Sequence, residues 1–300
     1  MTDENTRAGF VAVVGAPNAG KSTLVNALVG QKVAIVSAKA QTTRARLMGI
    51  AIEGGSQILL VDTPGIFQPK RRLDRAMVQA SWSGAEDAEL ILLVVDSNAG
   101  VTVEVERAIA GLEKRQHPLF VALNKVDLVK KEKLLGLATA LTERLKPEQV
   151  FMISAAQGDG VADLKRALAF TLPEGPWLYP EDEVSDATDR MVAAELTREQ
   201  IYEQLHQELP YASAVETETW SDRPDGSTEI RQQILVERDS QKAIVIGKGG
   251  SRLKAIGQAA REAISEHLGR KVHLFLHVKV NPKWGEDRGL YRDIGLEWAD

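Results

Sequence analysis

The stretch that decides the fold of this chain reads Gly9-Phe-Val-Ala-Val-Val-Gly15-Ala16-Pro17-Asn18-Ala19-Gly20-Lys21-Ser22. Its first half is a short apolar run bounded by glycines, which predicts a buried parallel strand. Its second half matches the pattern GxxxxGK followed by Ser or Thr, and predicts a loop leading into a helix from Lys21 to about Leu28. The loop N–H groups and the helix N-terminus would then point at one place, which suits a diphosphate. A glycine-rich turn without a ligand is the alternative, and four further motifs argue against it.

Three side chains and one glycine carry the predicted phosphate chemistry. Lys21 can reach the β- and γ-phosphates of a nucleotide, and the Ser22 hydroxyl can bind Mg²⁺. Asp62 closes the apolar run 58–61, so its carboxylate should lie at the ligand edge of a parallel sheet and hold Mg²⁺. The motif Asp62-Thr63-Pro64-Gly65 also predicts a β-turn, in which the Gly65 N–H can reach a γ-phosphate.

A second group of motifs predicts specificity for guanine. Asn124-Lys125-Val126-Asp127 follows a buried strand pattern at 118–123. The Asp127 carboxylate can accept hydrogen bonds from N1–H and the N2 amine of guanine, whereas adenine offers neither donor. The stem of Lys125 can cover the purine face. Ser154-Ala155-Ala156 ends the strand pattern 150–153, where a backbone N–H can reach the guanine O6 atom.

A polar loop between the first helix and the second strand completes the predicted nucleotide site. It reads Ala38-Lys-Ala-Gln-Thr-Thr-Arg44 and can close over the nucleotide. We favour the Thr43 hydroxyl as its Mg²⁺ ligand, with Thr42 as the alternative. Residue 66 is Ile, at the position where many GTPases place a Gln that orients water, so the usual side chain for that task is missing.

The predicted nucleotide site therefore binds GTP or GDP with Mg²⁺. Its Mg²⁺ ligands are Ser22, Thr43 and Asp62. Its nucleotide-binding residues are Gly15, Ala16, Pro17, Asn18, Ala19, Gly20, Lys21, Ser22, Thr23, Asp62, Thr63, Pro64, Gly65, Asn124, Lys125, Asp127, Ser154, Ala155 and Ala156.

The pattern changes after residue 172. Residues 173–186 carry three prolines and several acids, which predicts a linker. We expect domains at 1–172 and 189–300, joined by a linker at 173–188. The second half predicts a helix over 191–209, strands over 212–220 and 229–237, a short helix before Gly247, a helix ending near Leu268, and a strand over 271–280.

A glycine loop in the second half predicts RNA binding. Ile246-Gly247-Lys248-Gly249-Gly250 between two helices is the KH signature, whose loop clamps a few nucleotides of single-stranded RNA. The order of elements fits the type II KH arrangement, although a helix–turn–helix corner would also need glycine for positive φ. The whole chain has a net charge of −5, but residues 242–283 hold nine Lys and Arg against two Glu, a local charge of +7. This charge favours RNA, and we add Lys254 to the predicted RNA-binding residues.

Composition excludes several other classes of protein. The chain has no Cys, so it has no disulfide framework, no thiolate metal site and no Cys nucleophile. Its N-terminus is not a signal peptide, and its longest apolar run, 90–95, is far shorter than a membrane span. A cytoplasmic protein is expected.

One phosphate-loop domain followed by one KH domain with an intact GxxG loop resembles the bacterial Era family of GTPases. The likeness includes Gln41-Thr-Thr-Arg44, Asp62-Thr-Pro-Gly65, Leu178-Tyr-Pro-Glu-Asp182, Gln241-Lys-Ala-Ile-Val-Ile-Gly247 and the tail containing Trp284. It implies an α/β P-loop GTPase domain, with a mostly parallel sheet and helices on both faces, followed by an α+β type II KH domain.

The resemblance also implies a function. The chain would hydrolyse GTP, bind 16S rRNA near its 3′ end and assist assembly of the small (30S) ribosomal subunit. Asn18 occupies the position that helps bind a monovalent ion in K⁺-activated GTPases, so the expected catalytic residues are Lys21, Thr43, Gly65 and Asn18, with K⁺ as a further cofactor. A monomer with loose peripheral association at the inner membrane is expected.

Two other functions stay open on the residues alone. The first is an RNA-binding module whose nucleotide domain does not hydrolyse GTP, and the intact Lys21, Ser22 and Asp62 argue against it. The second is a GTPase whose KH fold contacts proteins or membranes, and the GxxG loop within a basic segment argues against it.

Overall fold

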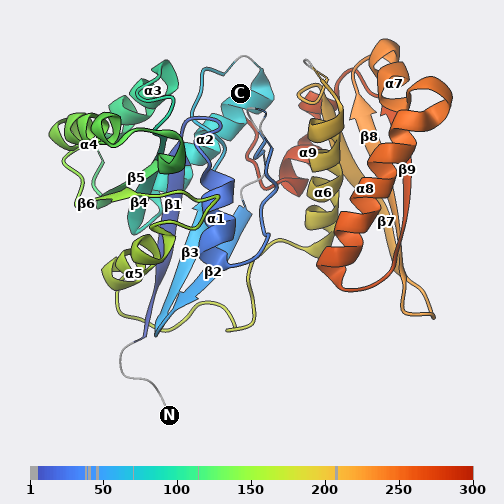
Figure 1. Cartoon of the computed structure of the whole chain (residues 1–300). Helices are drawn as coiled ribbons and strands as arrows, with labels where there is room; N and C mark the ends of the chain where they lie inside the picture. Colours follow the sequence, from blue (N-terminus) through green and yellow to red (C-terminus); the bar gives the residue numbers. More distant parts are fainter. Residues whose placement is uncertain are drawn as a thin grey trace. The chain divides into compact units, whose positions relative to one another are not determined.

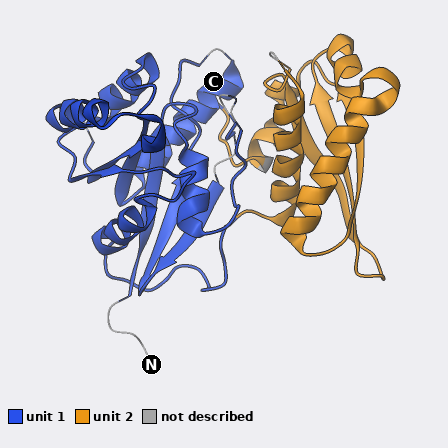
Figure 2. Cartoon of the chain, viewed as in Figure 1, with its two compact units in different colours: residues 1–186, 299–300 blue, residues 187–298 orange. Residues whose placement is uncertain are grey.

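The structure, a computed structural model, describes residues 6–299 except 38, 40, 41, 45, 46, 70, 114, 207 and 208. Gln41 of the Gln41–Arg44 motif therefore lies outside the described residues. The chain forms two compact units (Figures 1 and 2). The first comprises 1–186 with 299–300, and the second comprises 187–298.

The first unit is built on a six-stranded sheet in the order β2-β3-β1-β4-β5-β6. Neighbouring strands are parallel except for β2 and β3. The strands are β1 (Arg7–Gly15), β2 (Leu47–Glu53), β3 (Ser56–Asp62), β4 (Leu90–Asp96), β5 (Leu119–Asn124) and β6 (Gln149–Met152). The central strands are apolar without alternation because helices cover both faces of the sheet.

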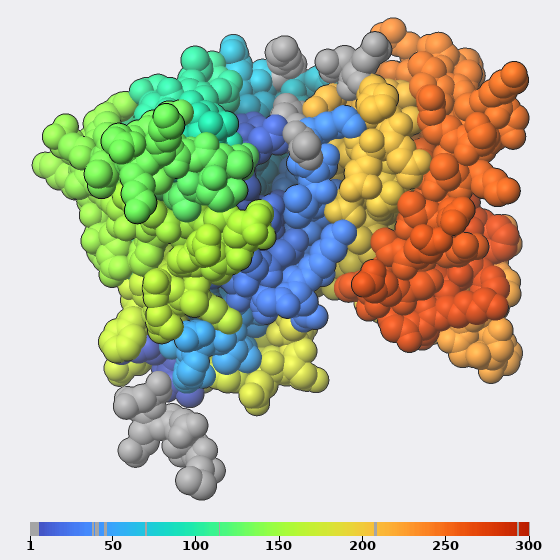
Figure 3. All heavy atoms as spheres, in the orientation of Figure 1, coloured from blue at the N-terminus to red at the C-terminus, as the bar shows by residue number. Residues whose placement is uncertain are grey.

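Two apolar cores lie on the two faces of this sheet. One contains residues of α1 (Lys21–Val29) and α5 (Val161–Thr171), and the other contains residues of α2 (Arg72–Glu86), α3 (Val103–Leu112) and α4 (Lys131–Leu145). Figure 3 shows α1 in blue and α5 in yellow-green, side by side on the visible face. Four of the parallel strands end at one edge in Gly15, Asp62, Asp96 and Asn124, and this edge is where ligands bind in such sheets.

Residues 173–186 are attached to the first unit by backbone hydrogen bonds. The Ala8 N–H donates to the Pro173 carbonyl (3.3 Å) and the Ile50 N–H donates to the Val184 carbonyl (2.9 Å). The chain passes from the first unit to the second between Asp186 and Ala187.

The second unit has a three-stranded sheet in the order β7-β8-β9, with β7 and β8 antiparallel and β8 and β9 parallel. Its elements are α6 (Asp189–Gln204), β7 (Ser213–Asp222), β8 (Thr228–Val236), α7 (Asp239–Ile246), η2 (Lys248–Gly250), α8 (Ser251–Leu268), β9 (Val272–Val280), η3 (Trp284–Glu286) and α9 (Arg288–Asp293). From α6 to β9 this is the order that the sequence predicted for a type II KH domain.

The first helix of this unit is shorter than its apolar pattern predicted. It ends at Gln204, but Leu205 and Leu209 still enter the core with Ile201. The Leu205 backbone is already extended, with φ of −105° and ψ of 155°, so apolar spacing alone placed the helix end too far along the chain.

Candidate functional site

The phosphate loop is shaped by two glycines that have no room for a side chain. A Cβ atom on Gly15 would lie 2.3 Å from the Val94 carbonyl oxygen, and one on Gly20 would lie 2.3 Å from Asn124 Nδ2. Both residues also have positive φ, 150° and 92°. The loop therefore passes close to β4 and β5 before α1 begins at Lys21.

Lys21 is buried inside this loop. Its Nζ atom donates to the carbonyls of Gly15 (3.3 Å) and Ala16 (3.1 Å). Burial lowers the pKa of Lys21 to about 8, against the opposing effect of the Asp62 carboxylate. A phosphate bound beside it would supply the negative charge that favours the ammonium form.

The three predicted Mg²⁺ ligands lie together. The Ser22 hydroxyl is 2.8 Å from the Thr43 hydroxyl and donates to Asp62 Oδ2 (2.8 Å), and Thr43 also donates to Oδ2 (3.3 Å). Among the described residues, the buried Asp62 Oδ1 has no hydrogen-bond partner. Burial raises the pKa of this carboxyl, although Lys21 and both hydroxyls lower it. Oxygen donors around a buried carboxylate with an unused oxygen fit a hard cation such as Mg²⁺.

The structure separates the two candidate threonines. Thr43 is buried beside Ser22, whereas the Thr42 hydroxyl donates to the Lys39 carbonyl (2.7 Å) in its own loop. Both threonines line a pocket beside Lys21 and Gly65, which we call the phosphate pocket. Ile35, Val36 and Ser37 also line it, and the sequence did not single them out. No motif marks these three residues.

The segment after Asp62 lies against the phosphate loop. A Cβ atom on Gly65 would lie 2.8 Å from the Pro17 nitrogen, so only glycine fits there. The Ile66 N–H donates to the Gly15 carbonyl (3.0 Å), and the Ile66 side chain is buried in an apolar core. Ile66 therefore has neither the chemistry nor the position to orient a water molecule.

Asn124 joins three of the predicted motifs. Its Nδ2 atom donates to the Ala19 carbonyl (2.9 Å), and its Oδ1 atom accepts from the Ala155 N–H (3.0 Å). The phosphate loop, the β5 end and the loop at Ser154 are thus fixed to one another. Asp127 lies exposed in η1 (Val126–Leu128), directly after this junction.

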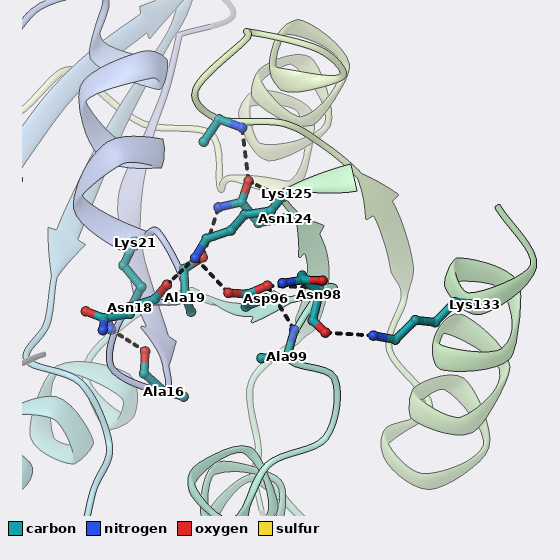
Figure 4. Close-up of polar contacts among 11 residues, drawn as sticks. Ala16, Asn18, Ala19, Lys21, Asp96, Asn98, Ala99, Asn124, Lys125 and Lys133 are labelled. Carbon is teal, nitrogen blue, oxygen red and sulfur yellow. Dashed lines mark hydrogen bonds and ion pairs between the residues drawn. The ribbon is translucent and has the colours of Figure 1, made fainter. Parts of the chain in front are cut away.

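Asp96 is a residue of this site that the sequence interpretation missed. Its Oδ2 atom lies 2.7 Å from the Lys125 ammonium, which also donates to the Asn18 carbonyl (2.7 Å) (Figure 4). The signal that could have found it is its place at the end of the apolar run 90–95. Asp62 and Asn124 end the neighbouring runs in the same way.

The predicted RNA loop joins α7 and α8 of the second unit. Gly247, Gly249 and Gly250 have φ of 70°, 60° and 79°, values that suit glycine. A groove of about 460 Å³ extends from this loop along α8 and β9. Its lining is basic and apolar, and comprises Gly250, Leu253, Lys254, Gly257, Gln258, Arg261, Leu274, Phe275 and Leu276. Of these residues, the sequence predicted Gly250 and Lys254 as RNA-binding. The other lining residues belong to no motif.

These features define a class of protein: a guanine-nucleotide P-loop domain followed by a type II KH domain. Residues 10–125 match the family described as 50S ribosome-binding GTPase, and residues 208–285 match the KH domain family. The chain is 59% identical to GTPase Era of Afipia carboxidovorans over 293 residues, which cover 98% of this chain and 95% of that protein. It is 57% identical to GTPase Era of Erythrobacter litoralis, with full coverage of both chains. The chain belongs to the Era family of GTPases.

Solved structures give the same result. A crystal structure of Era in complex with MgGDPNP and nucleotides 1506–1542 of 16S ribosomal RNA is 36% identical, with a TM-score of 0.92 over 97% of this chain and 99% of that one. A variant of Aquifex aeolicus Era bound to GDP and AlF4⁻ has a TM-score of 0.91. The predicted fold class and GTPase activity are confirmed. In the described part of the chain, each helix is too short or too polar to span a membrane.

Proposed function

We propose that this GTPase is a switch that binds 16S rRNA near its 3′ end and assists assembly of the 30S subunit. The observation that carries the proposal is that Ser22, Thr43 and Asp62 lie together beside the buried Lys21, in a chain whose second unit has a groove with basic residues beside a GxxG loop. The solved Era complex with MgGDPNP and nucleotides 1506–1542 of 16S ribosomal RNA supports the same pairing of ligands.

Hydrolysis would use the residues gathered at the edge of the sheet. Lys21 would neutralise the β- and γ-phosphates, while Ser22, Thr43 and Asp62 would hold Mg²⁺. The bound ion supplies positive charge that stabilises the transferring phosphoryl group. The Gly65 N–H would contact the γ-phosphate, so loss of that group on hydrolysis would release this segment and the Thr43 loop.

K⁺ is a further proposed cofactor, besides the nucleotide and Mg²⁺. Ile66 is buried in the core, so the side chain at this position cannot orient the attacking water for hydrolysis. Asn18 lies at the exposed rim of the phosphate pocket with φ of 62°, and its amide oxygen is a neutral ligand of the kind K⁺ takes. A K⁺ ion there would add positive charge near the β- and γ-phosphates.

RNA would enter the second unit along the groove between α8 and β9. Lys254 and Arg261 would contact phosphates, whereas Leu253, Phe275 and the glycine loop would contact bases and sugar. The predicted residues Ile246, Gly247, Lys248, Gly249 and Gly250 form the mouth of this groove in the proposal.

The test is fluorescence anisotropy with a labelled 3′-terminal fragment of 16S rRNA, in the presence of GDP or a non-hydrolysable GTP analogue. A scrambled RNA of equal length and charge is the control. Saturable binding that prefers the 3′ fragment supports the proposal, and equal affinity for both RNAs contradicts it.

Location and oligomeric state complete the proposal. We expect a cytoplasmic monomer with loose peripheral association at the inner membrane, in line with the family resemblance. Flotation with vesicles of inner-membrane lipid, with and without high salt, tests the membrane part, and sedimentation velocity tests the monomer.

A further inference from the structure

A carboxylate outside the predicted nucleotide motifs contacts the lysine that joins the base motif to the phosphate loop (Figure 4). We propose that Asp96 is a positioning residue: it holds the Lys125 ammonium against the phosphate loop and thereby slows release of the guanine nucleotide. The inference rests on the proposed role of this pocket in guanine-nucleotide binding, and it adds a residue to that site.

The register of the sheet places Asp96 beside the base motif. Asp96 at the end of β4 pairs with Asn124 at the end of β5, and Lys125 follows with φ of 64°. This left-handed backbone conformation accompanies two contacts of Lys125 Nζ, to Asp96 Oδ2 and to the Asn18 carbonyl, each at 2.7 Å. The lysine therefore bridges the phosphate loop and β4.

The two oxygens of Asp96 have separate tasks. Oδ2 accepts from Lys125, whereas Oδ1 accepts from the N–H groups of Asn98 (2.8 Å) and Ala99 (3.2 Å). One carboxylate thus closes its own loop and orients the lysine of the base motif. An Asn side chain at this position could not accept from both the Lys125 ammonium and the N–H groups of the loop. Its amide nitrogen is itself a donor and would face one of these donors.

Partial burial makes the attraction between Lys125 and Asp96 stronger than that of an ordinary surface ion pair. The Lys125 and Asp96 side chains are 31% and 20% exposed, so water and salt screen the pair less than a fully exposed one. A free lysine would lose rotamer freedom when its stem packs on the purine ring. Because Asp96 already restricts that side chain, part of the ordering cost is met before the nucleotide binds.

The loop that carries Asp96 has other supports. The Lys133 Nζ atom donates to the Asn98 carbonyl (2.6 Å), and the Ser97 N–H donates to the Asn124 carbonyl (2.9 Å). The Gly100 N–H donates to the backbone carbonyl of Asp96 (2.9 Å). A change of the Asp96 side chain alone should therefore alter the position of Lys125 without unfolding the loop.

The test is the dissociation rate of fluorescent mant-GDP, measured by stopped flow for a double-mutant cycle. The variants are Asp96→Asn, Lys125→Met and the double variant; Met keeps an apolar stem but lacks the ammonium. We expect Asp96→Asn to accelerate release about tenfold in the wild-type background and to have no effect in the Lys125→Met background. The control is Glu106→Gln, which breaks the exposed ion pair with Arg144 (2.8 Å) elsewhere in the first unit and should release mant-GDP at the wild-type rate.

A second variant of Asp96 distinguishes loss of the negative charge from a folding defect. Asp96→Ser keeps a hydroxyl that can accept from the Asn98 N–H but has no negative charge, so it should match Asp96→Asn. Equal acceleration in both lysine backgrounds, or an unchanged rate in Asp96→Asn, would overturn the role of Asp96. Failure of the wild-type protein to bind mant-GDP would instead overturn the proposed nucleotide site.

Discussion

The side-chain amide of Gln57 is hydrogen-bonded to both backbone groups of Tyr179. Its Nε2 atom donates to the Tyr179 carbonyl (2.8 Å), and its Oε1 atom accepts from the N–H groups of Tyr179 (3.0 Å) and Leu178 (2.8 Å). Gln57 lies in β3 and is fully buried. The proline-rich segment that leads to the second unit is therefore held by a strand 122 residues earlier in the chain.

Gln57→Leu should loosen this segment. The replacement removes three hydrogen bonds to backbone groups of Leu178 and Tyr179, at a cost of about 1–3 kcal/mol in the free energy of unfolding. Urea unfolding measures that loss, and limited proteolysis should show faster cleavage within 176–182. Gln149→Leu, at the exposed start of β6, is the control and should change neither result. Unchanged proteolysis in Gln57→Leu would show that other contacts hold the segment.

Thr43→Ala and Thr42→Ala should differ sharply in Mg²⁺-dependent GTP hydrolysis. The Thr43 hydroxyl lies beside Ser22 and Asp62, whereas the Thr42 hydroxyl bonds within its own loop. We expect Thr43→Ala to lower kcat about tenfold or more, a loss of at least ~1.4 kcal/mol of transition-state stabilisation. Thr42→Ala should stay near the wild-type rate. A titration of kcat against Mg²⁺ checks both, and the reverse ranking would move the cation ligand to Thr42.

Asp127→Asn should exchange guanine for xanthine preference. The carboxylate accepts from two donors of guanine, whereas an amide offers a donor to the carbonyl that xanthine carries instead of the N2 amine. Loss of hydrogen bonds to a charged group predicts a GTP affinity about 10- to 100-fold lower, with a gain for XTP. Competition of both nucleotides against mant-GDP measures the change. If the variant kept wild-type GTP affinity, Asp127 would not contact the base.

GTP hydrolysis by the free protein should be slow and faster in K⁺ than in Na⁺. Hydrolysis should be slow because Ile66 is buried and cannot orient the attacking water. A K⁺ ion at Asn18 should accelerate it, because the ion would add positive charge near the phosphates. Turnover is measured at constant ionic strength in KCl and NaCl for the wild-type protein and Asn18→Ala. The K⁺ stimulation should be lost in the variant. Equal wild-type turnover in both salts would contradict the K⁺ proposal.

The order of elements in the second unit followed from the sequence because glycine loops and apolar runs are local signals. In the first unit the same signals located β1, α1, β3, β5 and β6. Contacts between distant segments gave no such signal. Gln57 is an ordinary residue of a strand until residues 178 and 179 come to lie beside it. Asp96 belongs to no motif, and its role depends on a lysine 29 residues later. Thr42 and Thr43 have the same chemistry, so only the path of their loop distinguishes them.

Gly249→Asp should weaken RNA binding without affecting GTP binding. Gly249 has φ of 60°, which Asp tolerates better than most residues, and no atom lies within 4 Å of the position of a Cβ atom there. Gly247 is a poorer test site, because a Cβ atom would lie 2.8 Å from Arg252 Cβ and would disturb the loop itself. The added carboxylate would repel RNA phosphates by about 1 kcal/mol or more at ~4 Å, so affinity for the 3′ fragment should fall about tenfold.

The matched control for this variant lies at the other end of α8. Gly269 also has positive φ, 61°, and no atom within 4 Å of its Cβ position, so Gly269→Asp introduces the same side chain into a similar backbone beyond the glycine loop. It should bind RNA and GTP as the wild-type protein does. Anisotropy with the labelled RNA and mant-GDP titration compare the three proteins. Equal loss in both variants would indicate a general effect of charge on the second unit. Full RNA affinity in Gly249→Asp would place the RNA away from the GxxG loop.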